Sequence, residues 1–269
     1  MTLPVLDRVA VEWRGATFSL PYLFRSGPGP AILFVHGLGA AKEIFHSAFL
    51  SRALAECTLV TFDLPGSGLA EFAEGLDVSG LADLTQALAD RLLPGPYFFA
   101  GSSMGGLIAL LQMRRHGFDR IQGFMNLEGN LCPEDCMYSR RVIPHSLEVF
   151  ADFVYAQIID DMRASPHTGD RIVAENVAMN VDVRAYHAYS AETVRESDSG
   201  RLLDEFLALP MPRLFLYGEA NRALSYLPRL RDSDVEVREI QRSGHFFFHD
   251  NPIATFDAIG EFVHRHARR

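Results

Sequence analysis

Residues 97–111 read YFFAGSSMGGLIALL, an apolar run followed by small residues and a second apolar run. The first run, residues 97–100, is typical of a buried strand, and residues 104–116 predict a helix that begins almost at once. A strand and a helix joined so closely require a sharp turn with small side chains around it. Gly101 and Gly105 provide this space, so Ser103 is predicted to stand at the centre of the turn.

Ser103 is the candidate nucleophile, because residues 101–105 have the form Gly-x-Ser-x-Gly. The start of the following helix offers free N–H groups and a positive dipole where negative charge would develop. A tight turn that merely needs glycine is the alternative interpretation, but the strand before it and the helix after it favour a nucleophile. Ser102 is a poor rival, since Ala100 and Met104 would occupy its glycine positions.

Apolar runs and helical patterns alternate on both sides of this turn. Strands are expected at residues 9–13, 17–25, 31–35, 58–62, 97–100, 121–127, 213–217 and 235–241. Helices are expected at residues 43–56, 81–93, 104–116, 224–230 and 253–265. This rhythm predicts an α/β fold, in which a parallel sheet carries helices on both faces.

The rhythm stops between residues 129 and 212, where no strand pattern is found. Helical patterns cover residues 147–162, 170–179, 183–195 and 199–209 instead. We interpret residues 129–212 as a helical cap inserted into a core of residues 1–128 and 213–269. Such an insertion is expected to form a lid over the active-site edge of the sheet.

Two further segments have the pattern expected of a site around Ser103. His36-Gly37-Leu38-Gly39 follows a predicted strand, and the backbone N–H groups of Leu38 and Met104 could form an oxyanion hole; His36 itself is expected to be structural. Ser243-Gly244-His245 follows the last predicted strand, which makes His245 the candidate base. His249 is its nearest rival, whereas His264 and His266 lie in a terminal basic helix and are expected to be solvated.

Together, His36-Gly37, residues 63–68, the turn at Ser103 and Gly244-His245 resemble the α/β-hydrolase fold superfamily, of the serine esterase and lipase type with a helical cap. The resemblance covers nearly the whole chain. It implies a mostly parallel eight-stranded sheet, a triad in the chain order serine, acid, histidine, and no cofactor.

The chain departs from this superfamily at the position of the acid. Most members carry an aspartate after the strand predicted at residues 213–217, and here that position is Asn221. Either the triad lacks its carboxylate and is weakly active, or the acid stands at another position in the sequence. Some relatives, among them haloalkane dehalogenases, place the acid after the preceding strand, where this chain has Glu128. A carboxylate ending an apolar strand needs a partner, and His245 would be one; Glu219 is the alternative acid.

Composition and charge exclude several classes of binding partner. The chain has 269 residues, 48% of them hydrophobic, and a net charge of −9, so it is not a disordered chain and is not expected to bind nucleic acid or an anionic membrane. No apolar run reaches the ~18 residues of a spanning helix. No secretory signal is visible, which makes a cytoplasmic location the default expectation. Cys132 and Cys136 do not form a recognisable metal site.

The expected activity is that of a serine hydrolase, which cleaves a carboxylic ester or similar small acyl substrate through Ser103, His245 and Glu128. C–C bond hydrolases and cofactor-free peroxidases share the pattern around Ser103, and a non-catalytic ligand receptor on the same fold is a further alternative. Arg140 and Arg141 are expected on a solvated face, although either could meet an acidic substrate. Residues 246–248, three phenylalanines, are expected to pack in the core rather than to form a substrate wall.

Overall fold

The computed structural model describes residues 3–267, and eight strands in this range form one sheet in the order β1-β2-β4-β3-β5-β6-β7-β8. The strands are β1 (Val5–Trp13), β2 (Ala16–Arg25), β3 (Ala31–Val35), β4 (Thr58–Phe62), β5 (Tyr97–Ser102), β6 (Ile121–Leu127), β7 (Arg213–Gly218) and β8 (Glu236–Ile240). The β1–β2 and β2–β4 pairs are antiparallel, and the pairs from β4 through β8 are parallel. The predicted mostly parallel α/β sheet is therefore confirmed.

Helices cover both faces of this sheet. The α-helices are α1 (His46–Leu50), α2 (Val78–Leu92), α3 (Met104–His116), α4 (Ser139–Val142), α5 (Leu147–Val149), α6 (Tyr155–Arg163), α7 (Thr168–Asn180), α8 (Val183–Asp198), α9 (Leu202–Ala208), α10 (Leu227–Arg231), α11 (Phe247–Asp250) and α12 (Pro252–His266). Shorter turns are η1 (Lys42–Phe45), η2 (Pro133–Asp135), the π-helical η3 (Phe150–Val154) and η4 (Glu219–Asn221). Within residues 3–267, no helix is long and apolar enough to cross a membrane.

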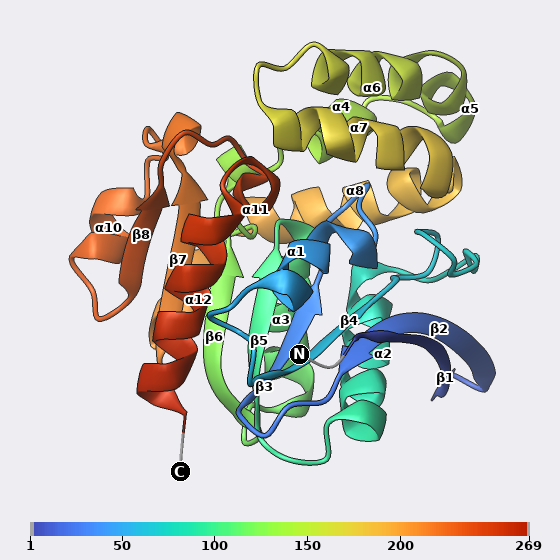
Figure 1. Ribbon diagram of the computed structural model, residues 1–269. Helices are drawn as coiled ribbons and strands as arrows, with labels where there is room; N and C mark the ends of the chain where they lie inside the picture. The colour runs from blue at the N-terminus through green and yellow to red at the C-terminus, as the bar shows by residue number, and fades with distance from the viewer. Residues whose placement is uncertain (1–2, 268–269) are drawn as a thin grey trace.

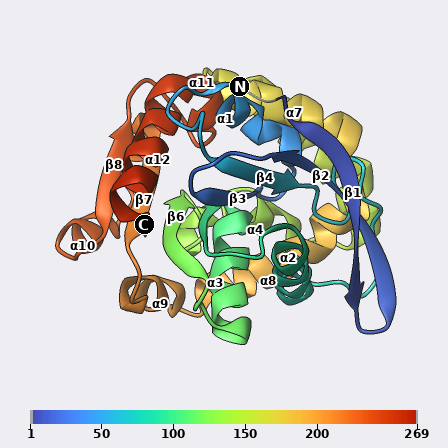
Figure 2. The same ribbon diagram turned by 60° about the horizontal axis from the view of Figure 1, so that its bottom comes forward.

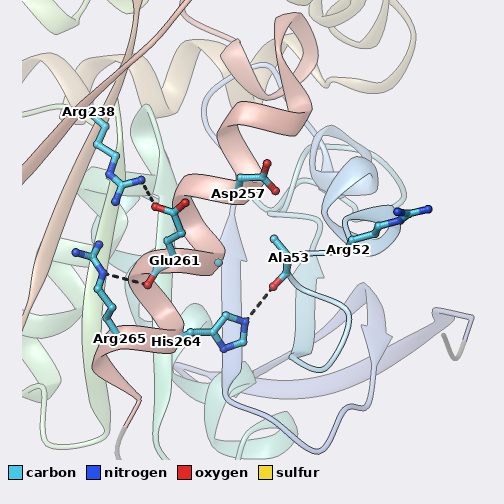
Figure 3. Close-up of a pocket in the computed structure, with 8 residues that line it drawn as sticks. Arg52, Ala53, Arg238, Asp257, Glu261, His264 and Arg265 are labelled. Atoms are coloured by element: carbon cyan, nitrogen blue, oxygen red, sulfur yellow. Dashed lines mark hydrogen bonds and ion pairs between the residues drawn. The ribbon is translucent and has the colours of Figure 1, made fainter.

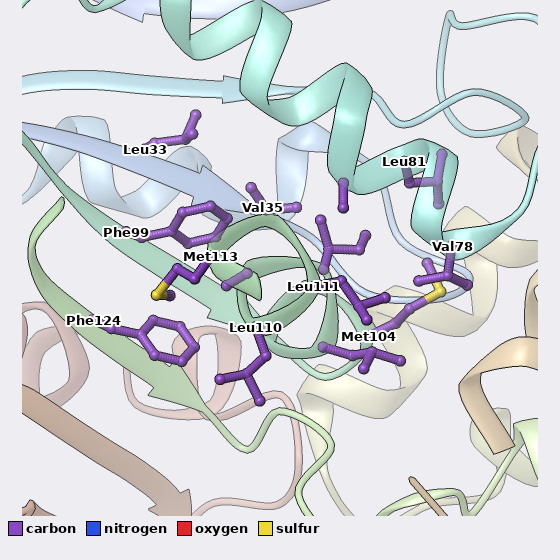
Figure 4. Packing of buried hydrophobic residues seen from close by; sticks show 14 of the residues in the cluster. Leu33, Val35, Val78, Leu81, Phe99, Met104, Leu110, Leu111, Met113 and Phe124 are labelled. Carbon is purple, nitrogen blue, oxygen red and sulfur yellow. The ribbon is translucent and has the colours of Figure 1, made fainter. Parts of the chain in front are cut away.

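Side chains alternate between the two faces of the central strands, as the pleat of a sheet requires. Leu33 and Val35 of β3 pack into one hydrophobic cluster with α2 and α3, while Ile32 and Phe34 pack into another with α1, α11 and α12. Figure 4 shows the first cluster, where Met104 at the start of α3 lies close to Val78 of α2. This packing holds α3, and hence the turn before it, firmly against the sheet.

The helix predicted at residues 43–56 is shorter than expected. Only η1 and α1 form, and the chain turns irregularly after Leu50. The guanidinium of Arg25, which is almost fully buried, donates hydrogen bonds to the carbonyl oxygens of Phe49, Leu54 and Cys57. A distant side chain therefore satisfies carbonyl groups that a continuing helix would have paired within itself.

The segment between β6 and β7 is helical in two separate places. Helices α4 to α8 stand above the sheet at the edge where β5, β6 and β7 end (Figure 1). Helix α9 lies instead beside α3 (Figure 2), and the ring of its Phe206 lies 5.5 Å from that of Phe124 on β6. Residues 202–208 fall within the segment predicted as a cap, residues 129–212, and they pack beside α3.

Candidate active site

Ser103 occupies the sharp turn between β5 and α3. Its backbone angles are φ 52° and ψ −123°, a left-handed conformation that is rare for a residue with a side chain. The two glycines are required by close approach: a Cβ on Gly101 would lie 2.4 Å from the carbonyl oxygen of Gly105, and one on Gly105 would lie 2.2 Å from that of Val35. The strand, turn and helix expected around Ser103 are present, with Ser103 at the strained position.

One small cavity brings Ser103 and His245 together. The edge of the sheet contributes Leu38, Ser103, Met104, His245 and Phe246 to its wall. The segment after β6 contributes Asn130, Asp135, Tyr138, Tyr186 and Thr193. The enclosed space is only about 20 Å³. No hydrogen bond joins the side chains of the two described residues Ser103 and His245, and such contacts often tighten only when substrate is bound.

The carboxylate of Glu128 holds the imidazole of His245. Nδ1 of His245 lies 2.6 Å from Oε2 of Glu128, whose side chain is only 5% exposed. Because β5 and β6 are neighbouring parallel strands, Glu128 at the end of β6 lies next to the turn after β5. An Nδ1–H group that donates to this carboxylate leaves Nε2 as the basic nitrogen of the ring.

Two more donors fix the same carboxylate. The backbone N–H of Gly218 donates to Oε1 of Glu128 at 2.6 Å, and the side-chain amide of Asn221 donates to Oε2 at 2.8 Å. Asn221 is thus an amide partner of Glu128. The alternative acid, Glu219, points elsewhere: it accepts from the backbone N–H of Arg242 at 2.7 Å and pairs with the side chain of Arg222 at 3.2 Å.

The electrostatics of His245 are set by opposing effects. Burial by itself lowers its pKa, but the hydrogen bond and the negative charge of Glu128, with smaller contributions from Asp170 and Asp135, raise the pKa above its ordinary value. A proton on this ring is therefore stabilised, which suits a group that must accept one from a hydroxyl.

The loop after β3 brings Leu38 to the cavity and is firmly held. Nε2 of His36 accepts a hydrogen bond from the backbone N–H of Leu64 at 3.0 Å, and its Nδ1 lies 2.8 Å from the carbonyl oxygen of Gly37. These contacts require a neutral ring, and burial lowers the pKa of His36 accordingly. Met104, as the first residue of α3, has no partner within the helix for its N–H, which lies beside Ser103.

A buried ion pair lies next to the loop after β3. Nζ of Lys42 lies 2.8 Å from Oδ2 of Asp63, and both side chains are at most 1% exposed. Asp63 also accepts hydrogen bonds from the backbone N–H groups of Lys42 and Leu69, each at 2.9 Å. The only lysine of the chain therefore has a structural position and does not line the cavity.

Two polar residues of the cavity wall, Asn130 and Asp135, were not among the predicted site residues. Burial raises the pKa of Asp135 to about 6; its Oδ2 accepts from the backbone N–H groups of Leu131 and Cys132, and its Oδ1 from the hydroxyl of Tyr226. No local pattern marks either residue. Their only signal is position, since both closely follow Glu128 at the end of a strand.

One expectation about the aromatic residues requires correction. Phe247 and Phe248 are fully buried in the core as expected, whereas Phe246 also forms part of the cavity wall. Its ring centroid lies 4.9 Å from that of His245, because the two residues follow each other on the loop after β8. The rival His249 is not among the residues that line the cavity.

A surface hollow of about 660 Å³ lies along α12 and away from this site (Figure 3). Some of its polar groups contact one another: Arg238 contacts Glu261 at 2.7 Å, and the ring of His264 lies 3.1 Å from the carbonyl oxygen of Ala53. Residues 3–267 contain no cluster of three or more His, Cys, Asp or Glu side chains placed to hold a metal ion.

Comparison with known proteins finds enzymes that are similar in sequence. A pimeloyl-[acyl-carrier protein] methyl ester esterase from Neisseria meningitidis is 35% identical over 85 residues, 32% of this chain and 26% of that protein. The matching part therefore spans only about a quarter of that relative's length. A 2-succinyl-6-hydroxy-2,4-cyclohexadiene-1-carboxylate synthase from Yersinia pseudotuberculosis is 23% identical over 248 residues, 83% of this chain and 84% of that enzyme.

Structural comparison finds the same fold in a thermophilic esterase from Thermogutta terrifontis. Its TM-score is 0.79 at 21% identity, and the match covers 97% of this chain and 100% of that one. The family described as the alpha/beta hydrolase family matches residues 32–258. This match takes in the turn at Ser103, Glu128 and His245, and it covers most of the sequence. The chain belongs to the alpha/beta hydrolase family.

Proposed function

We propose that the protein is a serine hydrolase that cleaves a carboxylic ester or a related acyl substrate through Ser103, His245 and Glu128. The contact of 2.6 Å between His245 Nδ1 and Glu128 Oε2, at a cavity that Ser103 also lines, is the observation that carries the proposal. The names of the relatives, a methyl ester esterase among them, support an ester substrate.

In this mechanism the hydroxyl of Ser103 attacks the carbonyl carbon while Nε2 of His245 takes its proton. The N–H groups of Leu38 and Met104 donate to the oxyanion, and the positive end of α3 adds to their effect. His245 then passes its proton to the leaving group as the acyl-enzyme forms. Water, activated by the same ring, cleaves the acyl-enzyme and restores Ser103. Glu128 keeps Nδ1 protonated and stabilises the imidazolium of each step.

We also propose that the helical segment between β6 and β7 acts as a cap that shapes specificity. Tyr138, Tyr186 and Thr193 of this segment line the cavity, whereas the proposed nucleophile, acid and base all lie on loops after β5, β6 and β8. The proposal assigns selection of the acyl group to the residues of α4 and α8 and the loop before α4, and chemistry to the edge of the sheet.

Labelling with a fluorophosphonate tests the nucleophile. The wild-type protein should form one covalent adduct, and Ser103→Ala should form none while unfolding at the wild-type temperature, because alanine fits the turn. Ser102→Ala is the matched control: this neighbouring hydroxyl is buried, and the variant should be labelled like the wild type. A folded Ser103→Ala variant that still hydrolyses esters at the wild-type rate would disprove the assignment.

A further inference from the structure

The cavity beside Ser103 is nearly closed. Its enclosed volume of about 20 Å³ holds about one water molecule, far below the ~300–1,000 Å³ of sites for drug-sized ligands. The rings of Tyr138, Tyr186 and Phe246 form part of its wall. Tyr186 is 2% exposed and stacks on Phe150 with a centroid distance of 5.8 Å, so this side of the wall is backed by packed side chains.

The wall of this cavity contains an acidic residue, Asp135, and no lysine or arginine among the described residues. Arg140 and Arg141, the two candidates for meeting an acidic substrate, pair instead with Asp198 at 2.5 Å and Asp161 at 2.8 Å. Both oxygens of Asp135 already accept hydrogen bonds from protein groups, so this residue acts on a substrate through its field, which opposes an anion.

Asn130 supplies an acceptor that no protein group uses. It is 2% exposed; its Nδ2 donates to the sulfur of Cys136 at 3.4 Å, but Oδ1 has no hydrogen-bond partner among the described residues. Its backbone N–H lies 3.4 Å from the carbonyl oxygen of Ser103, which places the residue next to the turn. Leaving a buried acceptor unpaired costs about 1–3 kcal/mol, a cost that a ligand with a donor at this point would offset.

We propose that the site takes a non-anionic ester that carries a hydroxyl or amide N–H group close to the scissile carbonyl, and that this group donates to Oδ1 of Asn130. The inference rests on the proposed serine hydrolase function and names its substrate class. Thr193 lines the same cavity, but its hydroxyl donates to the carbonyl oxygen of Tyr189 at 2.8 Å within α8. Asn130 is therefore assigned as the residue that determines this specificity.

Three methyl esters with four-carbon acyl groups test the wild-type protein: methyl butanoate, methyl 3-hydroxybutanoate and monomethyl succinate. We expect kcat/KM for the hydroxy ester to exceed that for the butanoate by about tenfold, as one recovered hydrogen bond implies. The anionic succinate should be the poorest of the three. Equal values for the hydroxy ester and the butanoate, or a preference for the succinate, would overturn the proposal.

Asn130→Leu, which keeps the size of the side chain and removes its acceptor, should bring the ratio of the two kcat/KM values close to one. Ser102→Ala, which removes a buried hydroxyl that does not line the cavity, is the control and should keep the wild-type ratio. Asn130→Ala replaces the leucine variant if that variant does not fold. An unchanged ratio in a folded Asn130 variant overturns the assignment of this residue.

Fluorophosphonate labelling at Ser103 distinguishes a wrong substrate class from a wrong function. If the wild-type protein is labelled and hydrolyses all three esters without discrimination, only the substrate class is wrong. If it is neither labelled nor active on any ester, the proposed function fails and this inference fails with it.

Discussion

Replacing Glu128 by glutamine should lower kcat about 10²–10⁴-fold, because the change keeps the shape of the side chain and removes its charge. The structure indicates how glutamine would sit. If its oxygen replaces Oε2 of Glu128, it still accepts from His245 Nδ1 and from Asn221, and its NH₂ group faces the N–H of Gly218. The imidazole then keeps its orientation at the expense of one backbone hydrogen bond.

The expected size follows from the buried contact between Glu128 and His245. Removing one partner from a buried ion pair costs about 3–5 kcal/mol, and tenfold in rate corresponds to about 1.4 kcal/mol. The imidazolium forms only as Ser103 attacks, so the loss falls on kcat. The same carboxylate raises the pKa of His245. Without it, the neutral ring persists to lower pH, and the acid limb of the pH profile of kcat/KM should move downward.

Initial rates on a short-chain 4-nitrophenyl ester, measured between pH 5 and pH 9, provide the assay. Glu219→Gln makes the same chemical change at the neighbouring carboxylate and should leave kcat within about threefold of the wild-type value, because Glu219 contacts Arg242 and Arg222 and not His245. Asn221→Ala should lose far less than Glu128→Gln. Full activity of Glu128→Gln, or an equal loss in Glu219→Gln, would refute the reasoning.

Two further predictions concern stability. Lys42→Met leaves Asp63 buried without its cation and should lower the free energy of unfolding in urea by about 3–5 kcal/mol; a loss below 1 kcal/mol would contradict the structural role of the pair. Burial lowers the pKa of His249 to about 4, whereas the same ring in the unfolded chain titrates near 6.5. Between pH 4 and pH 6.5 the unfolded chain therefore binds more protons than the folded protein. The free energy of unfolding should therefore fall by about 3 kcal/mol as the pH drops from 6.5 to 4, and His249→Phe should remove that part of the dependence in pH-dependent denaturation.

The turn around Ser103 could be predicted from the sequence because its requirements are local. A helix that begins at Met104 directly after a buried strand needs small neighbours, and Gly101 and Gly105 meet this need within five residues. The predicted bounds of α3 and β6 agree with the structure. A side chain that directly follows such a strand lies at the edge of the sheet, which is why Glu128 could be predicted as the acid.

Contacts between distant segments could not be predicted in this way. Helix α1 ends at Leu50 because Arg25, far away in the sequence, pairs with the carbonyl groups beyond it. Asn130 and Asp135 become cavity residues only because α8 and the loop after β8 close over the end of β6. Helix α9 has the same helical pattern as its neighbours, and only its packing on α3 separates it from them.

The neutral residue at position 221 is best understood together with the acid at position 128. A carboxylate at 221, in the place of an amide whose nitrogen lies 2.8 Å from Oε2 of Glu128, would put two negative charges in contact, and one of them would take up a proton. An amide at this point donates instead, and with Gly218 it orients the carboxylate toward His245. On our proposal the end of β6 has taken over the acid and the end of β7 has become its support. The asparagine is then a consequence of moving the acid by one strand, which is why its loss should weaken the triad far less than the loss of the charge on Glu128.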